Sequence, residues 1–329
     1  MQIVLSLDIP LGMIMRIPSR NGLSRREFIA RALAVSSTAA VWRGGDWSCL
    51  AAGETIPRIV VFSKAYQALK LNFEDAAAVT AEGGLDGVDC PVRPGGEILP
   101  EHAVAEMPRY VAALRKRNLS MPLLTTGITS AASPHTEEIL RTAKALGVQY
   151  YRLGFVERRM DVPAAEQCLE IKAQLKDLAA LNQQIGIGAI FQNHSPAGRT
   201  YVGGNLTELC DVVQGFDQAQ IGVAFDIGHA LVVHGDQWRA HFEKLKSHIK
   251  VVYVKDVTRD GRWVPFGQGA IGGLGYFKLL RQMGYRGPIC LHVEFDWSEK
   301  GKAKTREALV KALRDSSRAL KQWLEQAQG

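Results

Sequence analysis

Eight polar residues recur near the ends of short apolar segments in this 329-residue chain, and their side chains are those of an enzyme site. They are Asp89, Arg152, Gln192, His194, Asp226, Lys255, His292 and Glu294. Two carboxylates with nearby imidazole nitrogens suit a hard or borderline divalent cation such as Mn²⁺, Mg²⁺ or Zn²⁺. We therefore predict a divalent metal ion held by Asp226, Glu294 and His194.

Such a site predicts proton transfer next to a carbonyl group. A metal ion that bridges a carbonyl and a hydroxyl of a sugar acidifies the adjacent C–H bond, and a carboxylate can then move the proton. The catalytic candidates are Glu294, His194 and Lys255, with Lys255 placed to stabilise a developing enediolate oxygen. Arg93 or Arg152 could hold a phosphate or a carboxylate. The substrate-binding candidates are Arg93, Arg152, Gln192, His229, His292 and Trp263.

Several of these residues also have a purely structural explanation. Asp89 could be an ion-pair partner or a helix N-cap. His229 follows an apolar segment and could cap the next helix, and a lone histidine such as His194 is more often a satisfied loop residue than a ligand. Trp263 belongs to a long loop, 258–272, that either closes over a sugar ring or packs on the surface.

The elements that would position these residues alternate regularly between strand and helix patterns. Strands are predicted at 58–62, 87–90, 121–126, 148–153, 185–192, 221–226, 250–255 and 288–294, with a helix after each. Eight such pairs predict an α/β fold, a (β/α)₈ TIM barrel. No G-x-G-x-x-G motif follows the first strand, which argues against an open dinucleotide-binding sheet. Alternation within each strand then directs the polar residues into the lumen, near the carboxyl ends of the strands.

Composition excludes several other classes of protein. The formal charge of +7 is spread thinly, with no dense Lys/Arg tract, so no nucleic-acid partner is expected. The five cysteines are scattered without a C-x-x-C pair, which argues against a disulfide framework and a thiolate metal site. No run is long and apolar enough for a stable membrane span in the mature protein.

The first fifty residues have the character of a targeting segment. The stretch Ser24-Arg25-Arg26-Glu27-Phe28-Ile29 precedes a mildly apolar run of small residues and resembles a twin-arginine export signal. We expect residues 1–53 to be an export signal and linker and residues 54–329 to form a single barrel domain. The mature protein is then expected to be periplasmic.

A series of short motifs, taken in order, adds a family resemblance. They are Phe62-Ser63-Lys64, Gly87-Val88-Asp89, Val92-Arg93-Pro94-Gly95-Gly96, Gln192-Asn193-His194-Ser195, Phe225-Asp226-Ile227-Gly228-His229-Ala230, Val254-Lys255-Asp256, Pro265-Phe266-Gly267-Gln268-Gly269, Gly287-Pro288-Ile289 and Leu291-His292-Val293-Glu294. Together they resemble the sugar phosphate isomerase/epimerase group of the xylose isomerase-like TIM barrels.

The resemblance implies a divalent metal held by a Glu, an Asp, a His and a final Glu, with the two Glu residues as acid and base. The Asp corresponds to Asp226, the final Glu to Glu294, and His229 to a position that contacts substrate. Two positions depart from the pattern: the Glu of strand five is replaced within Gln192-Asn193-His194, and the His of strand seven is Tyr253. His194, Gln192 or His292 could substitute for the missing ligands.

Three hypotheses follow. The first is an exported sugar isomerase or epimerase, or a lyase acting on an oxidised sugar, with a small-molecule sugar as its partner. The alternative is a non-catalytic sugar-binding barrel that has lost part of the metal site. A nuclease of the endonuclease IV type would need a richer His/Glu/Asp cluster and a basic surface, and is not expected.

Overall fold

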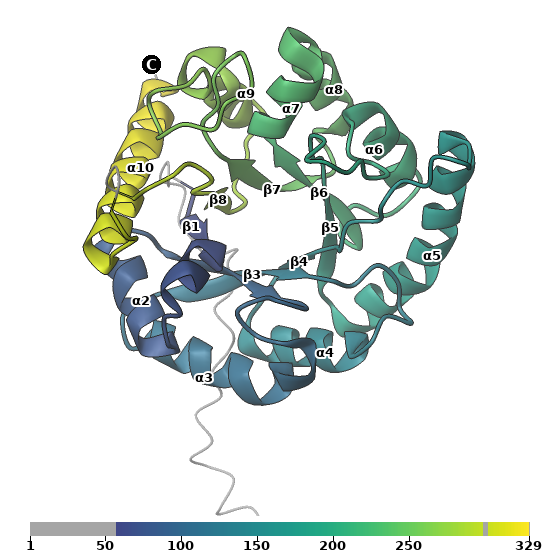
Figure 1. Ribbon diagram of the computed structural model, residues 1–329. Helices are drawn as coiled ribbons and strands as arrows, with labels where there is room; N and C mark the ends of the chain where they lie inside the picture. Colours follow the sequence, from purple (N-terminus) through teal and green to yellow (C-terminus); the bar gives the residue numbers. More distant parts are fainter. Residues whose placement is uncertain (1–56, 299–301, 329) are drawn as a thin grey trace, which may run out of the picture. The chain divides into compact units, whose positions relative to one another are not determined.

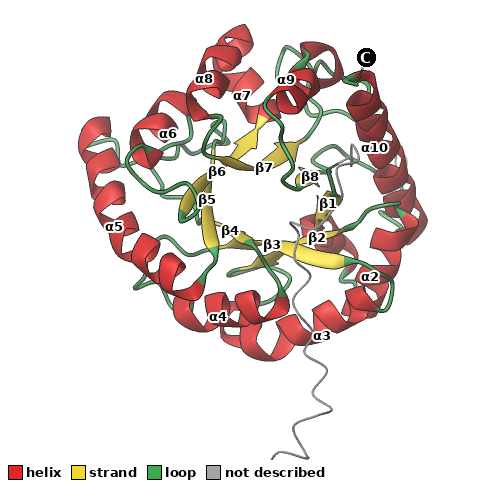
Figure 2. Cartoon of the chain, turned by 180° about the vertical axis from the view of Figure 1, so that it is seen from behind, coloured by secondary structure: helices red, strands yellow, loops and turns green. Residues whose placement is uncertain are grey.

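The polar residues predicted to share a lumen lie on the strands of a closed parallel ring or just beyond their carboxyl ends. The computed structural model describes residues 57–298 and 302–328, and Figures 1 and 2 show its inner ring of strands inside an outer ring of helices. The predicted (β/α)₈ barrel is therefore confirmed. The predicted export signal and linker, residues 1–53, lie outside the described residues.

The strands follow chain order around the barrel. They are β1 (Ile59–Phe62), β2 (Gly87–Val92), β3 (Ser120–Thr126), β4 (Tyr150–Arg152), β5 (Gly188–Gln192), β6 (Ile221–Asp226), β7 (Ile249–Val254) and β8 (Ile289–Leu291). The ring closes because β1 pairs with β8, which places Val60 beside Cys290 and Val61 beside Leu291. All carboxyl ends of the strands consequently face the same end of the barrel.

The helices cover the outside of this ring and begin and end at residues suited to capping. They are α2 (Phe73–Glu82), α3 (Ala103–Arg115), α4 (Thr136–Leu146), α5 (Ala164–Ile185), α6 (Leu206–Val213), α7 (Ile227–His234), α8 (Trp238–Leu245), α9 (Tyr276–Gln282) and α10 (Arg306–Gln326), with 3₁₀ segments η1 (Ser63–Leu69), η2 (Pro100–His102), η3 (Gly235–Gln237) and η4 (Ile271–Leu274). The side chains of Asn72, Asn205 and Thr305 accept backbone N–H groups at three helix starts. Within the described ranges, no helix combines the length and the apolar character needed to cross a membrane.

One helix that the sequence prediction missed and two strand boundaries that it misplaced affect the elements around the polar residues. Helix α7 was missed because Ile227–His234 is apolar on most sides and lacks an amphipathic period. Strand β5 starts only at Gly188, because α5 continues through Ile185 and ends at Gly186, whose φ of 77° favours glycine. Strand β8 stops at Leu291, so His292 and Glu294 belong to the segment that follows it.

The alternation along the strands divides the apolar residues into two cores. The larger core lies between the strands and the helices and includes Val252 and Val254 of β7. The smaller core fills the lumen with side chains that include Val60, Leu123 and Tyr253. Tyr253 points inward between two outward-facing valines, as the sequence predicts. Lys255, which follows β7 and has the same parity as Tyr253, is 3% exposed.

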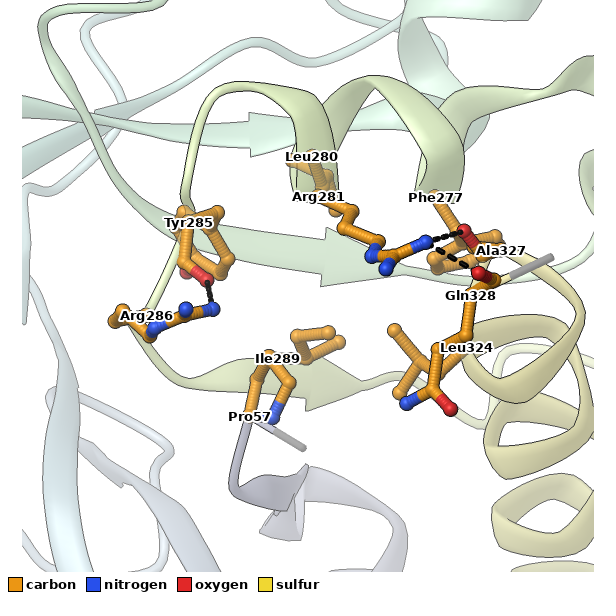
Figure 3. Close-up of a pocket in the computed structure, with 10 residues that line it drawn as sticks. All are labelled: Pro57, Phe277, Leu280, Arg281, Tyr285, Arg286, Ile289, Leu324, Ala327 and Gln328. Atoms are coloured by element: carbon orange, nitrogen blue, oxygen red, sulfur yellow. Dashed lines mark hydrogen bonds between the residues drawn. The ribbon is translucent and has the colours of Figure 1, made fainter. Parts of the chain in front are cut away.

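The amino-terminal end of the barrel has a different character. A pocket of about 270 Å³ lies there between α9, α10 and the starts of β1 and β8, and Figure 3 shows Pro57, Phe277, Ile289 and Leu324 around it. At its edge Arg281 donates to the backbone carbonyls of Ala327 and Gln328, the two residues that follow α10. This pocket is at the opposite end of the strands from the polar residues described next.

Candidate active site

Lys255 lies at the centre of a buried polar cluster just beyond the ends of β6 and β7. Its Nζ atom is 3.2 Å from Asp226 Oδ2 and 2.8 Å from His229 Nε2. The three side chains are almost inaccessible to solvent, with residue exposures of 3% for Lys255, 0% for Asp226 and 3% for His229. A buried cation is tolerated only with a partner, so the carboxylate of Asp226 accounts for the ammonium group at this depth.

The imidazole of His229 is neutral and has a defined tautomer. Burial, together with the neighbouring Lys255, lowers the pKa of His229 well below its usual range. Because Nε2 accepts a hydrogen bond from Lys255, Nδ1 carries the proton and donates to Ser195 Oγ at 2.8 Å. The ring of His194 lies 3.9 Å from that of His229, and burial and Lys255 lower the pKa of His194 as well. Neutral imidazoles therefore surround a single positive charge.

Asp226 is held in place by the end of β5. Its Oδ2 accepts from Gln192 Nε2 at 2.9 Å, and its Oδ1 accepts the backbone N–H of His229 at 3.2 Å, which caps α7. The side chain of Asn193 also bonds both the N–H and the carbonyl of Asp226, at 2.8 and 2.9 Å. The Gln-Asn pair thus fixes the carboxylate against Lys255.

A second polar cluster lies in the lumen around Asp89. Asp89 Oδ2 accepts from the hydroxyls of Tyr253 at 2.9 Å and Thr125 at 3.1 Å, and Cys290 Sγ is 3.7 Å away. Arg152 donates from Nε to the same Thr125 hydroxyl at 3.4 Å, and its guanidinium lies 4.4 Å from the ring of Phe155. Burial raises the pKa of Asp89 and lowers that of Arg152.

His292 and Glu294 follow β8 and lie at the mouth of the barrel, the end at which the carboxyl ends of the strands meet. The ring of His292 lies between Phe62 and Tyr253, at centroid distances of 4.8 and 4.5 Å. Burial, followed by the charges of Lys255 and Arg152, lowers the pKa of His292 well below its usual range, so this imidazole is neutral. Glu294 Oε1 is 3.9 Å from His292 Nδ1, and 28% of the Glu294 side chain is exposed. Glu294 is therefore open to an incoming ligand, whereas His292 is enclosed.

The remaining predicted substrate contacts lie at the rim. Arg93 is half-buried, with its guanidinium 5.9 Å from the ring of Phe62. Trp263 packs over the Lys255 cluster, since Lys255 Nζ is 5.1 Å from its ring and the His229 ring is at the same distance. The loop that carries Trp263 is fixed by Asp256, whose carboxylate accepts the backbone N–H groups of Gly267 and Gly269 at 2.8 and 2.9 Å.

The donor set does not fit the four-ligand metal site that the sequence resemblance implies. Both oxygens of Asp226 are engaged, and Oδ2 already faces an ammonium group. Gln192 and Tyr253, at the two altered positions, act as hydrogen-bond donors toward carboxylates rather than as ligands. Lys255 therefore supplies positive charge where the resemblance places a cation.

The trio predicted to hold a metal is also not assembled. In the described ranges, one group of three side chains has its ligand atoms within 4.8 Å of one another, and it is Asp89, Cys290 and His292. Glu294 instead lies 3.7 Å from Lys64 Nζ. Asp226, Glu294 and His194 do not form such a group. Burial and Asp89 raise the pKa of the Cys290 thiol well above its usual value, which disfavours the thiolate that a metal requires.

The sequence prediction located most of the cluster but missed several of its members. The predicted lumen residues that are buried here are Asp89, Arg152, Gln192, Asp226, Lys255 and His292. Thr125, which joins Asp89 to Arg152, and Cys290 were not singled out, although both share the inward parity of their strands. Ser195 and Asn193 were part of a quoted motif but were given no role.

Comparisons with known proteins agree with this architecture. The family described as "Xylose isomerase-like TIM barrel" matches residues 77–322. A comparison with curated protein sequences gives no match.

Solved structures of sugar epimerases share the fold at low sequence identity. They include 3-keto-D-glucoside 4-epimerase from E. coli, with 14% identity, a TM-score of 0.61, and coverage of 81% of this chain and 100% of that one. A D-tagatose 3-epimerase-like protein has 18% identity and a TM-score of 0.62, covering 82% and 98% of the two chains. D-psicose 3-epimerase from Clostridium cellulolyticum has 13% identity and a TM-score of 0.59, covering 82% and 96%.

Proposed function

Because the chain belongs to the xylose isomerase-like TIM barrel family, we propose that it is a sugar isomerase or epimerase. It would move a proton next to a carbonyl group of a sugar or an oxidised sugar. The observation that carries this proposal is the buried ammonium group of Lys255, held by Asp226 and by neutral His229 at the carboxyl ends of the strands. That end is where barrels of this kind keep their catalytic residues.

Lys255 is proposed to stabilise the charge that develops on the substrate oxygen. Removing a proton next to a carbonyl leaves an enediolate, and a fixed cation in a site shielded from water stabilises such an oxyanion strongly. The ammonium group is oriented beforehand by Asp226 and His229, so little reorganisation is needed during the reaction. His229 does not take the proton of Lys255, because burial and the charge of Lys255 lower the pKa of this imidazole well below its usual range.

Two groups are proposed to move the proton from different sides of the mouth. Glu294 follows β8 and His194 follows β5, and these strands are separated in the ring by β6 and β7. Glu294 is partly exposed and can act as the base. The Nε2 atom of His194 is unprotonated, because Nδ1 donates to the Ser195 carbonyl, so Nε2 can take up a proton and then, as the imidazolium, return it to the substrate. Such a pair suits an epimerase, because a proton that leaves one face of the carbon atom is returned to the other face.

The other predicted residues are proposed to hold the sugar. Trp263 offers an aromatic surface for the apolar face of the ring. Arg93, Gln192 and His292 supply polar groups around it. No step in this proposal passes through a metal ion, since Lys255 provides the positive charge at Asp226. A small sugar is the proposed partner, and export to the periplasm is proposed on the twin-arginine motif.

The proposal is tested by exchange of a substrate C–H with solvent. The purified chain would be incubated in D₂O with a panel of keto sugars, aldoses and their oxidised forms, and loss of the relevant proton signal would be followed by NMR. Lys255→Met is expected to lower the exchange rate by about 10²–10³-fold, as for loss of one oxyanion donor. Lys250→Met is the matched control, because Lys250 lies at the amino-terminal end of β7, the strand that Lys255 follows, and is bonded to Gln218.

The alternative, a sugar-binding barrel without catalysis, is supported by the altered residues Gln192 and Tyr253. It predicts saturable sugar binding with no C–H exchange for any member of the panel. Exchange that persists unchanged in Lys255→Met would instead contradict the role of Lys255.

A further inference from the structure

Four buried polar atoms in the lumen have no hydrogen-bond partner within the part of the chain that the structure describes. They are Asp89 Oδ1, Arg152 Nη1 and both ring nitrogens of His292. The residues themselves are between 0% and 4% exposed. Buried polar atoms are nearly always paired in proteins, so an unpaired set at the centre of a candidate active site indicates the groups that a ligand must supply.

Two of these atoms belong to side chains that a single hydroxyl group holds side by side. Thr125 Oγ1 donates to Asp89 Oδ2 at 3.1 Å and accepts from Arg152 Nε at 3.4 Å. Asp89 and Arg152 are therefore joined through one hydroxyl group, and each has an unpaired atom in the lumen. Tyr253 connects the third residue to them, since its hydroxyl bonds Asp89 and its ring lies against His292.

The two unpaired ends require opposite partners. A guanidinium group only donates hydrogen bonds and stays charged, so Arg152 Nη1 requires an acceptor, preferably an anion. The oxygen Asp89 Oδ1 is served by a donor such as a hydroxyl group, because Thr125 and Tyr253 already donate to the other oxygen. Packing on Phe155 keeps the guanidinium of Arg152 away from bulk water, so Nη1 depends on an acceptor inside the lumen. The neighbouring Asp89 interacts with Arg152 electrostatically and through Thr125, and leaves Nη1 without a hydrogen bond.

Building on the proposed function, we propose that the substrate is a sugar acid: a polyhydroxylated molecule whose carboxylate binds Arg152 and whose hydroxyl binds Asp89. A phosphate ester fits this position less well. It carries a charge of about −1.5 to −2 near pH 7, whereas a single guanidinium faces it and the carboxylate of Asp89 stands beside it. A carboxylate matches one guanidinium in both charge and planar geometry.

The test compares ligands that differ only in this group. Binding to the wild-type chain would be measured by calorimetry for D-glucuronate and D-glucose, for D-galacturonate and D-galactose, and for D-glucose 6-phosphate. The sugar acids are expected to bind at least about tenfold more tightly than the matched neutral sugars, the effect of one charge-assisted hydrogen bond. Equal affinities in every pair, or tighter binding of the phosphate ester, would overturn the inference.

Variants locate the preference within the site. Arg152→Met is expected to reduce the affinity for sugar acids to within about threefold of that for neutral sugars, because the carboxylate then has no guanidinium to bind. A threefold ratio corresponds to a difference in binding free energy of less than about 1 kcal/mol. Arg141→Met is the control, since Arg141 is exposed on α4 and pairs with Glu137. A loss of both affinities by the same factor in Arg152→Met would contradict the assigned role. If that variant does not fold, Arg152→Lys and the wild-type ligand pairs still decide the question.

The outcomes also separate this inference from the proposed function. A preference for sugar acids without C–H exchange would contradict the proposed catalysis and leave the binding assignment standing. Exchange on neutral sugars without any preference for the acids would do the reverse.

Discussion

The ion pair between Lys255 and Asp226 should be energetically coupled far more strongly than an ion pair on the surface. Both side chains are almost fully buried and their charged atoms are 3.2 Å apart. Removing one partner leaves the other charge buried without compensation, which costs about 3–5 kcal/mol. We therefore expect Lys255→Met and Asp226→Asn each to lower the free energy of unfolding by about this amount.

The double variant provides the sharper test. With both charges removed, no uncompensated ion remains, so Lys255→Met/Asp226→Asn should cost at least about 2 kcal/mol less than the sum of the single changes. Unfolding in urea can be followed by the fluorescence of the six tryptophans in the chain. The control is Lys246 with Glu243, an ion pair at 2.8 Å whose side chains are both 54% exposed, for which we expect a coupling of about 0–1 kcal/mol.

Additivity of the two buried changes within about 0.5 kcal/mol would refute the reasoning, because residues that do not interact behave in this way. That result would mean that Lys255 does not neutralise Asp226 in solution, and that Asp226 is free to bind another cation.

Three further predictions concern pH, metal content and the barrel wall. Burial raises the pKa of Glu97 from 4.5 to about 7, and its enclosed carboxylate bonds Ser63. The native state therefore binds more protons than the unfolded state between these two values, and stability should fall as the pH rises through them. Glu97→Gln should flatten the decline of the urea midpoint between pH 5 and pH 8, and an unchanged decline would argue against Glu97 as its source. Mass spectrometry should find far less than one metal ion per chain, both in the wild type and in Asp226→Asn. EDTA should leave the rate of C–H exchange unaltered. If the wild type instead holds one metal ion per chain and Asp226→Asn loses it, the pairing of Lys255 with Asp226 is contradicted. A Cβ atom at Gly87 would lie 2.0 Å from the Ser120 carbonyl oxygen, so Gly87→Ala should lower the free energy of unfolding by about 3 kcal/mol or more. Gly273→Ala, with open space around its Cβ position, is the control and should change stability little.

Much of the architecture could be predicted because period-2 alternation carries the direction of each side chain. Asp89 is polar between apolar Val88 and Cys90, and the structure buries it in the lumen while those neighbours pack against the helices. The same reasoning placed Lys255 and Tyr253 on the inner side of β7. Helix α7 escaped prediction because its sequence has no polar face, and its start is set by the carboxylate of Asp226.

The pairing within the site could not be predicted from single strands. Whether Lys255 meets Asp226 or Glu294 depends on the register between neighbouring strands, and the β6–β7 register shifts between Val223 and Ala224. Thr125 gains its role only because β3 lies between Asp89 on β2 and Arg152 on β4. Such contacts join residues that are distant in sequence, and alternation within one strand carries no information about them.

The pairing of β1 with β8 has a consequence for how the protein is made. Ile59 of β1 lies opposite Ile289 of β8 in the paired strands. The ribosome must therefore add 230 residues after Ile59, up to Ile289, before the ring can close. At about 5–20 residues per second, the ribosome needs roughly 10–50 s for this stretch. Throughout that time one edge of β1 has no partner, and exposed strand edges promote aggregation. The nascent chain should therefore depend on chaperones until its last strand emerges, and the lumen cluster should stay hydrated until that moment.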